Sequence, residues 1–322
     1  MIIKTNKTLI AAIVFRLATA IFLITIFLSY YLALRLENER FLRVPSGALK
    51  PIITQLGNDG VDLGTIDLWL IRFLGVFLGA PKYGLIDIGD ANTTRLDLYL
   101  ALIHGKSAFD EITLIPGETT LVSIDAIAQK LVLNADKMRT IYYEKAPFDE
   151  GVLIPETYQI IKGSSEREAM ISLIERSMKI HKDRAIKQFG VYDEREWFRI
   201  VTIASIVQKE AASNSEMPLV ASVIYNRLKK NMRLQMDGTL NYGYFSHKKV
   251  TPERIKSDTS DFNTYKKRGL PPYPVALAGS EAIEAALNPA KSDYLYFVRG
   301  DDGQHDFSEN YREHLGNIHG KK

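Results

Sequence analysis

One carboxylate interrupts an apolar helical face in the segment "IASIVQKEAASNSEMPLVASVIYNRL" (203–228). Positions i, i+3, i+4 and i+7 of a helix share one side, so Ile203, Ile206, Val207 and Glu210 are predicted to share a packed face. Burial disfavours a charged carboxylate, and so does the negative end of a helix dipole. A carboxylic acid that stays protonated near neutral pH is what general acid catalysis requires.

Periodicity alone leaves a second interpretation of Glu210 open. A glutamate at the edge of a packed face commonly reaches its head group into solvent. The segment that follows predicts a new helix, because Ser213 and Glu216 have capping-box spacing and Pro218 falls in the first turn. Glu210 would then lie at a junction between two helices.

The composition is that of a globular protein with a sizeable core. Hydrophobic residues make up 46% of the 322-residue chain and charged residues 25%. The absence of cysteine excludes zinc–cysteine sites, iron–sulfur clusters and thiol chemistry. It is compatible with an oxidising compartment but also with the cytosol. His305 and His314 match no compact metal motif, so we expect no metal or cofactor and a structural role for both.

The net charge of +3 comes from the N-terminal flank, which holds Lys4, Lys7 and Arg16 and no acidic residue before position 35. The rest of the chain is balanced, with 38 basic and 38 acidic residues. A body without excess positive charge is not predicted to bind nucleic acid.

The run "LATAIFLITIFLSYYLAL" (17–34) holds no charged residue. It predicts a transmembrane helix over 17–35, with Arg16 reaching the cytoplasmic boundary and Tyr30 and Tyr31 at the far interface. The basic flank before it favours a cytoplasmic N-terminus and an exported body. The alternative is a cleaved signal peptide, whose apolar region is shorter and ends at a small-residue cleavage site. No such A-x-A site follows, so residues 1–35 are predicted to be a cytoplasmic tail and an uncleaved anchor.

Residues 36–110 read as a small separate unit. "RFLRVPSG" predicts a strand, "ALKPIITQLGNDG" a helix, "TIDLWLIRFLG" a second helix that stops at Gly75, and "KYGLIDIGD" a second strand. This β-α-α-β order is similar to that of LysM-like carbohydrate-binding modules. A plain subdomain without a ligand of its own is the alternative.

Residues 111–322 mix helices and short strands without a strict βαβ alternation. A long amphipathic helix is predicted over 165–189, a short one over about 280–288, and a strand in "DYLYFV". The predicted fold class is therefore α+β, with 111–322 as a larger domain after the small unit.

Several ordered motifs carry a family resemblance. They are "IPGETT" (115–120), "EGVLIPETY" (150–158), "IASIVQKE", "VASVIYNRL", "MRLQMDGTLNYG" (232–243), "NTYKKRGLPPYPVALAG" (263–279), "ALNPAKSDYLYFV" (286–298) and "GQHDFSENYREH" (303–314). Together they resemble the MltG/YceG-like family of membrane-anchored endolytic murein transglycosylases. The resemblance covers nearly all of the exported part, and it implies that 111–322 is the transglycosylase catalytic domain.

The resemblance implies that Glu210, which closes the "ASIVxKE" helix, is the catalytic acid. Gln208 stands where family members often carry a second acid, which leaves Glu210 alone in the motif. Gly238 stands where the family usually has a proline after the aspartate, and it is expected to loosen that loop.

Further site residues follow from the same motifs. Some are expected to bind N-acetyl groups or orient Glu210: Asn226, Gln235, Asp237 and Thr239. Asn263 and Tyr265 are expected to line a glycan groove. For each of them a structural role is the alternative, and Asp237-Gly238 is also a ready turn dipeptide.

The implied reaction cleaves peptidoglycan between N-acetylmuramic acid and N-acetylglucosamine without water, leaving 1,6-anhydro ends. The resemblance also implies an inner-membrane enzyme with a periplasmic catalytic domain. It further implies partnership with peptidoglycan synthases (penicillin-binding proteins) and termination of glycan polymerisation. Two alternatives remain: a tethered glycan-binding scaffold without activity, and a hydrolase that uses Glu210 and Asp237 as a carboxylate pair.

Overall fold

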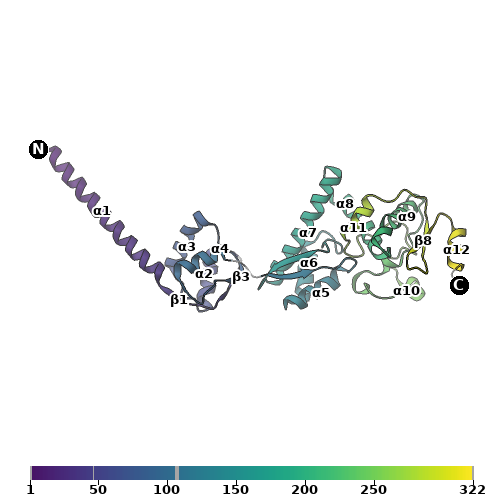
Figure 1. The fold of residues 1–322 in the computed structure, drawn as a ribbon, viewed down its shortest axis with the longest axis horizontal. Helices are drawn as coiled ribbons and strands as arrows, with labels where there is room; N and C mark the ends of the chain where they lie inside the picture. Colours follow the sequence, from purple (N-terminus) through teal and green to yellow (C-terminus); the bar gives the residue numbers. More distant parts are fainter. Residues whose placement is uncertain (1, 46, 106–108, 321–322) are drawn as a thin grey trace. The chain divides into compact units, whose positions relative to one another are not determined.

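The structure is a computed structural model, and it describes residues 2–45, 47–105 and 109–320. It mixes helices and strands, as the predicted α+β class requires (Figure 1). The chain divides into two compact units. The N-terminal unit holds residues 1–110 with 161–163, and the C-terminal unit holds 111–160 with 164–322.

The N-terminal unit joins a long helix to a small α+β body. Its elements are α1 (Ile2–Ala33), β1 (Arg35–Glu37), β2 (Phe41–Val44), α2 (Leu49–Asn58), α3 (Thr65–Leu78), β3 (Gly84–Asp87), β4 (Asn92–Thr94) and α4 (Arg95–His104). Strand β1 pairs antiparallel with β4, and β2 pairs antiparallel with β3. Leu42 and Ile86 are register partners in the second pair, and both are buried in the core of this unit. The alternation of buried and exposed residues along β2 and β3 is what places these side chains inside.

The order β2-α2-α3-β3 follows the prediction for this unit, but the predicted helix stop at Gly75 is wrong. Helix α3 continues to Leu78 and ends at Gly79, which has a φ of 98°. Gly79 adopts the left-handed backbone that favours glycine, whereas Gly75 keeps a helical backbone. The helix is therefore longer and carries more apolar surface than the sequence pattern indicates.

Helix α1 contains a segment, Ala11–Ala33, that is long and apolar enough to cross a membrane. Its mean hydropathy is 2.4, and none of it is buried inside the protein. It begins earlier than the predicted span and includes Arg16. The segment fits a single-pass membrane anchor. Only Leu34 separates α1 from β1.

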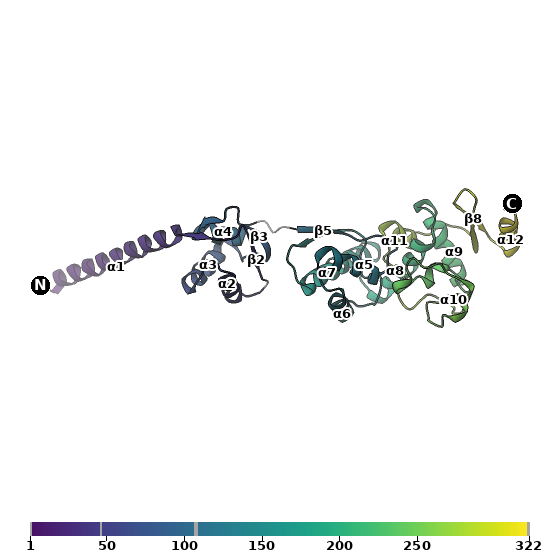
Figure 2. The same ribbon diagram turned by 90° about the horizontal axis from the view of Figure 1, so that it is seen from below.

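The helices of the C-terminal unit are α5 (Thr120–Leu131), α6 (Ala135–Lys145), α7 (Glu166–Phe189), α8 (Glu194–Glu210), α9 (Met217–Lys229), α10 (Pro252–Ser257), α11 (Ser280–Leu287) and α12 (Tyr311–His319). The unit packs α9 and α11 against α8, and α6 against α5 and α7. Its strands form two pairs: β5 (Phe109–Thr113) with β6 (Thr157–Ile161), and β7 (Tyr296–Arg299) with β8 (His305–Ser308). Helix α11 lies beside α8 in both views (Figure 1 and Figure 2). Every residue from 201 to 207 is buried, so α8 forms the centre of the core.

The connection from α8 to α9 differs from the predicted capping box. Ser213 makes no side-chain capping bond and precedes a short 3-10 turn, Asn214–Glu216. The Glu216 carboxylate instead accepts hydrogen bonds from the backbone and ring nitrogens of His305, so the capping-box prediction is wrong. Helix α9 does carry Pro218 in its first turn, as predicted.

Candidate active site

Glu210 is the last residue of α8, at the end of a buried apolar stripe. Ile203, Ile206 and Val207 are each at most 1% exposed, which confirms the predicted packed face. The Asp193 side chain caps the start of the helix, and Ala211 leaves it with an extended backbone. Glu210 itself is half-buried, so its carboxyl group lies between the core and the surface.

The surroundings of Glu210 favour its protonated form. Burial raises the pKa of Glu210 to about 7, and the charge of Asp237 pushes the pKa in the same direction. The amide of Gly238 opposes this rise, as do the charges of Arg227 and Lys209. A carboxyl group with this pKa exchanges its proton near neutral pH, which suits an acid that must later act as a base.

Gly238 touches the candidate acid through its backbone. Its amide nitrogen donates to Oε1 of Glu210 over 2.6 Å. A Cβ atom on residue 238 would lie 2.8 Å from that oxygen and 2.6 Å from Cβ of Lys209. The position therefore needs a residue with an N–H and no side chain. A proline would lack the donor, so this glycine gives the loop a contact with the acid.

Asp237 and Tyr265 form a pair next to this contact. The Tyr265 hydroxyl donates to Oδ1 of Asp237 over 2.6 Å. Burial raises the pKa of Tyr265, and the bond to Asp237 raises it further, so the phenol stays protonated and remains a donor. Asp237 is exposed and begins the 3-10 turn Asp237–Leu240, whose second residue is Gly238.

Thr239 and Asn263 are buried and hold the loops around the acid. Thr239 Oγ1 donates to the carbonyl of Met236 over 2.7 Å and lies 2.9 Å from Oγ1 of Thr264. The Asn263 amide donates to the carbonyls of Ile255 and Asp258 over 2.9 and 2.8 Å. Both side chains bond atoms of the loops, which is what a positioning role requires.

Asn226 and Gln235 lie in different settings. The Asn226 amide donates to the carbonyls of Ser292 and Tyr294 over 2.8 and 3.0 Å, so it braces α9 against the segment before β7. Gln235 is exposed and has a φ of 49°, and its backbone nitrogen donates to the Thr264 carbonyl over 3.2 Å.

The structure thus brings Glu210, Asp237 and Tyr265 into one chain of contacts through Gly238. Asn226, Thr239 and Asn263 are engaged with backbone or loop atoms, and the Gln235 side chain faces solvent. A direct role of any of these residues in binding glycan stays a prediction.

Sequence reasoning missed Arg227, although it lies in the quoted motif "VIYNRL". Arg227 is 7% exposed, and its guanidinium donates to the carbonyls of Leu295 and Leu234 over 2.6 and 2.5 Å. It also lies over the Tyr296 ring at 5.1 Å. Burial lowers the pKa of Arg227, and its positive charge acts on Glu210. A buried arginine beside an acid is visible only once the loops from distant segments are in place.

Lys209 is the second residue that the sequence did not single out. Its Nζ donates to the carbonyls of Gly117 and Ser246, each over 3.0 Å, and to Oγ of Ser246 over 3.2 Å. The Ser246 hydroxyl donates in turn to Glu118 over 3.2 Å. Lys209 therefore ties the end of α8 to two loops and adds a positive charge next to Glu210.

Metal binding finds no support in the described part of the chain. No group of three or more His, Cys, Asp or Glu side chains there could hold an ion. His305 pairs with Glu216 at 2.8 Å, and the His314 ring stacks on Tyr296 at 5.1 Å. Both histidines contact other side chains of the protein, and their structural role stays a prediction.

The model of the YceG-like family matches residues 43–320. The chain belongs to the YceG-like family. The match takes in the N-terminal unit from residue 43 onward, the C-terminal unit up to residue 320 and every residue of the candidate site. Among solved structures, this YceG-like chain is similar to a putative yceG-like protein from Listeria monocytogenes, with a TM-score of 0.55 and 28% sequence identity. That likeness covers 85% of this chain and 97% of the other.

Curated relatives are similar to part of the YceG-like chain. A protein of Bacillus subtilis named endolytic murein transglycosylase is 37% identical over 170 residues, which cover 51% of this chain and 46% of that protein. A protein of Streptococcus pneumoniae with the same name is 32% identical over 178 residues, which cover 52% of this chain and 31% of that protein. The match therefore spans less than half the length of these relatives.

Proposed function

We propose that this protein is an endolytic lytic transglycosylase that cleaves peptidoglycan glycan strands between N-acetylmuramic acid and N-acetylglucosamine. The observation that carries the proposal is the placement of Glu210, half-buried at the end of α8 with a pKa raised to about 7. Family membership and the names of the curated relatives support the choice of substrate.

The bond from Gly238 distinguishes the two carboxyl oxygens of Glu210. Oε1 accepts the amide hydrogen of Gly238, so Oε2 is the oxygen that presents the proton to substrate. A fixed orientation of this kind favours catalysis, because a small displacement of a proton donor from its acceptor lowers the reaction rate steeply.

Glu210 acts twice in the proposed reaction. Protonated Glu210 first donates to the glycosidic oxygen as the bond to the muramoyl C1 breaks, and N-acetylglucosamine leaves with that proton. The carboxylate then accepts the proton of the muramoyl C6 hydroxyl while O6 forms a bond to C1. One side chain serves as acid and then as base, and the product carries a 1,6-anhydro ring.

A hydrolase with Glu210 and Asp237 is the second candidate function. Hydrolysis needs a second carboxylate that attacks the sugar or activates water. Asp237 is the acid beside Glu210 in the described site, but one of its oxygens accepts the Tyr265 hydroxyl. This engagement favours a role for Asp237 in positioning, and so favours the route without water.

The finer assignments rest on the same proposal. The apolar helix α1 would anchor the protein in the cytoplasmic membrane with its N-terminus inside, so that the catalytic unit acts on nascent strands outside. Peptidoglycan synthases are the expected partners, and termination of glycan polymerisation is the expected consequence. The β2-α2-α3-β3 body is proposed as a LysM-like module that binds glycan.

Product analysis tests the reaction. Full-length protein in detergent is incubated with purified peptidoglycan, and the soluble fragments are identified by mass spectrometry. We expect 1,6-anhydromuramoyl ends from the wild type and none from Glu210→Gln. Glu196→Gln is the matched control, because Glu196 is an exposed acid in the first turn of the same helix.

The same digestion separates the alternatives. Reducing ends in place of anhydro ends would replace the proposal with hydrolysis. Sedimentation with peptidoglycan but no released fragment would leave only a binding scaffold. Equal activity of Glu210→Gln and wild type would remove Glu210 from the mechanism.

A further inference from the structure

Helix α3 exposes an apolar stripe along its length. Ile66, Trp69, Phe73, Val76 and Phe77 follow helical spacing and are between 44% and 76% exposed. The only charged residues of the helix are Asp67, which is buried, and Arg72, which is exposed and lies over the Trp69 ring at 5.4 Å. An exposed stripe of this size on a folded unit marks an interaction surface.

The position of α3 in the chain limits what this surface can meet. Only Leu34 lies between helix α1, the proposed anchor, and strand β1, so the α+β body of the N-terminal unit starts where the anchor ends. Leu32, in the last turn of α1, packs against the core of that unit. A body joined in this way stays at the bilayer surface, because no linker allows it to move away.

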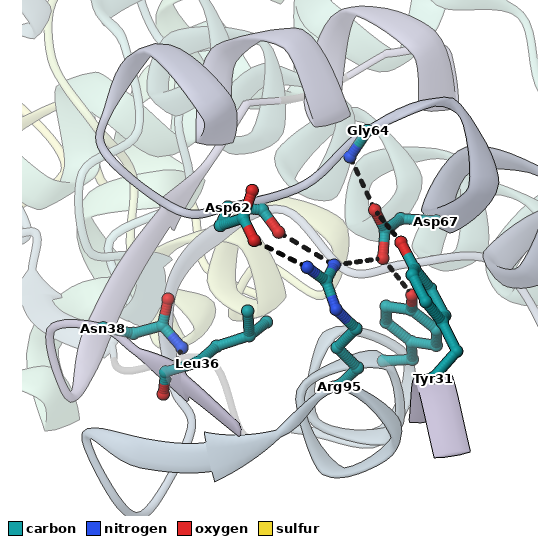
Figure 3. Close-up of polar contacts among 8 residues, drawn as sticks. Tyr31, Leu36, Asn38, Asp62, Gly64, Asp67 and Arg95 are labelled. Atoms are coloured by element: carbon teal, nitrogen blue, oxygen red, sulfur yellow. Dashed lines mark hydrogen bonds and ion pairs between the residues drawn. The ribbon is translucent and has the colours of Figure 1, made fainter. Parts of the chain in front are cut away.

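A buried polar cluster fixes α3 to the end of the anchor (Figure 3). The Tyr31 hydroxyl, on α1, donates to Oδ2 of Asp67 over 3.0 Å, and the guanidinium of Arg95 donates to Oδ1 of Asp67 over 2.6 Å. Arg95 also lies over the Tyr31 ring at 4.7 Å, and the Tyr99 hydroxyl bonds Asp67 as well. The first turn of α3 is thus tied to the last turn of α1.

The chemistry of the stripe fits a lipid interface. A helix of 14 residues is about 21 Å long, too short to span a bilayer but suited to lie in its surface. Tryptophan prefers the interface, and an arginine beside it can reach lipid phosphates. We propose that α3 is an interfacial helix whose apolar stripe rests in the bilayer next to the point where α1 leaves it.

The proposal commits to lipid as the occupant because the surface is continuous with the anchor. A second copy of the chain or the membrane helix of another protein would also bury the stripe. A second copy or another membrane helix would have to displace the lipid that the proposed anchor brings next to this surface. Quenching of Trp69 by bromine on the acyl chains distinguishes lipid from protein.

Tryptophan fluorescence reports on α3 directly. The chain has two tryptophans; Trp197 is buried in the C-terminal unit and Trp69 is 62% exposed. Full-length protein is reconstituted in vesicles of phosphatidylcholine and phosphatidylglycerol, with plain or brominated acyl chains. The Trp69 signal is the difference between wild type and Trp69→Phe. We expect bromine to quench most of this signal, and acrylamide in the water to quench little.

Two variants test the stripe itself. Phe73→Ser combined with Phe77→Ser should release Trp69 from bromine quenching and shift its emission to longer wavelength. Phe41→Ser is the matched control, since Phe41 is 43% exposed on β2 of the same unit, and it should leave the signal unchanged. All three side chains are exposed and none belongs to the buried core of the unit.

A label gives a second readout. Because the chain has no cysteine, Phe77→Cys accepts a single nitroxide, whose relaxation should respond to oxygen more than to an aqueous nickel chelate. Nanodiscs that hold one chain each exclude a second copy.

Two outcomes of the fluorescence experiment would contradict the proposal. Trp69 shielded from acrylamide but not quenched by bromine would mean a protein partner, and Trp69 quenched only by acrylamide would mean a solvated face. Either result overturns the proposal, and neither depends on glycan cleavage.

Discussion

The backbone nitrogen of Gly238 lies 2.6 Å from Oε1 of Glu210, so a loop 28 residues further along the chain orients the candidate acid. The contact comes from the main chain, and the absence of a side chain at 238 is what leaves room for it. The loop and the acid are therefore one functional unit, and changes in either should be felt by the other.

Gly238→Ala tests this unit. The new Cβ would have to displace the Glu210 carboxyl or the Lys209 stem, because both lie closer than a normal contact allows. We expect a loss of at least about tenfold in the rate of anhydro-product release, or ~1.4 kcal/mol in the barrier. Gly316→Ala in α12 is the control, since a Cβ there meets no atom within 4 Å. Equal rates for Gly238→Ala and wild type would contradict the account of the loop.

The pH dependence of the rate should follow the titration of Glu210. The first step needs the protonated acid, and burial raises the pKa of Glu210 to about 7. The rate should therefore fall as the pH rises through about 7, by about tenfold for each further unit. Initial rates on a soluble glycan fragment across the pH range measure this limb. A rate that stays constant from about pH 6 to pH 9 would show that Glu210 is not the acid.

Lys209 should set the pH at which the rate falls on the alkaline side of the profile, its alkaline limb. Its charge lowers the pKa of Glu210, so Lys209→Met should move the alkaline limb to higher pH. The variant also loses the bonds to Gly117 and Ser246 and should lower the maximal rate. Lys209→Arg keeps the charge and should restore the position of the limb. A limb that moves equally in both variants would mean that loop geometry, and not charge, sets it.

Glu150 should contribute to the stability of the C-terminal unit. This buried carboxylate accepts the backbone N–H and the hydroxyl of Thr120 at the start of α5, and the N–H of Gly151. It acts as a cap supplied from another segment, because Thr119 makes no capping bond. Glu150→Ala leaves these buried donors without an acceptor and should cost about 3 kcal/mol in the free energy of unfolding. Urea titration measures it. Glu144→Ala, exposed on α6, should change it by less than about 0.5 kcal/mol, and a similar small change for Glu150→Ala would refute the cap.

The pair of Glu216 and His305 should give a stability that depends on pH. Burial opposes the charged form of Glu216, but the bonds from His305 hold the pKa of this carboxyl below its usual value. The stabilisation is present above the unfolded pKa of about 4.3 and is lost as the pH falls through the lowered pKa. Glu216→Gln should therefore cost about 2 kcal/mol at pH 7. The difference in the free energy of unfolding between Glu216→Gln and wild type should shrink in acid. Thermal unfolding of both proteins at pH 7 and at a pH below the lowered pKa would show whether it does.

The sequence was most informative where a residue's environment follows from its near neighbours. The stripe of Ile203, Ile206 and Val207 predicted a packed face that ends at Glu210, and the structure has it. The strands β2 and β3 and the helices between them follow turn and period signals of the same local kind. The motifs that suggested the family lie inside the residues that the family model matches.

Prediction from the sequence failed where a residue's contacts are made by a distant partner. Ser213 and Glu216 have the spacing of a capping box, but His305 binds Glu216 more closely than any local donor. The roles of Arg227 and Lys209 depend on carbonyls from residues far along the chain. The miss at Gly75 is of a different, local kind, because the apolar residues directly after it continue α3 to Leu78. No window of neighbouring residues contains the partners of Glu216, Arg227 and Lys209.

The short connection through Leu34 would couple the proposed membrane anchor α1 rigidly to the body that follows it. With Leu32 packed against the core and Tyr31 bonded to Asp67, α1 and the α+β body of the N-terminal unit are joined without a hinge. A membrane helix adjusts its tilt when the bilayer becomes thicker or thinner. Such a tilt would rotate the attached body rigidly. The orientation of its proposed glycan-binding face would then depend on the thickness of the surrounding lipid.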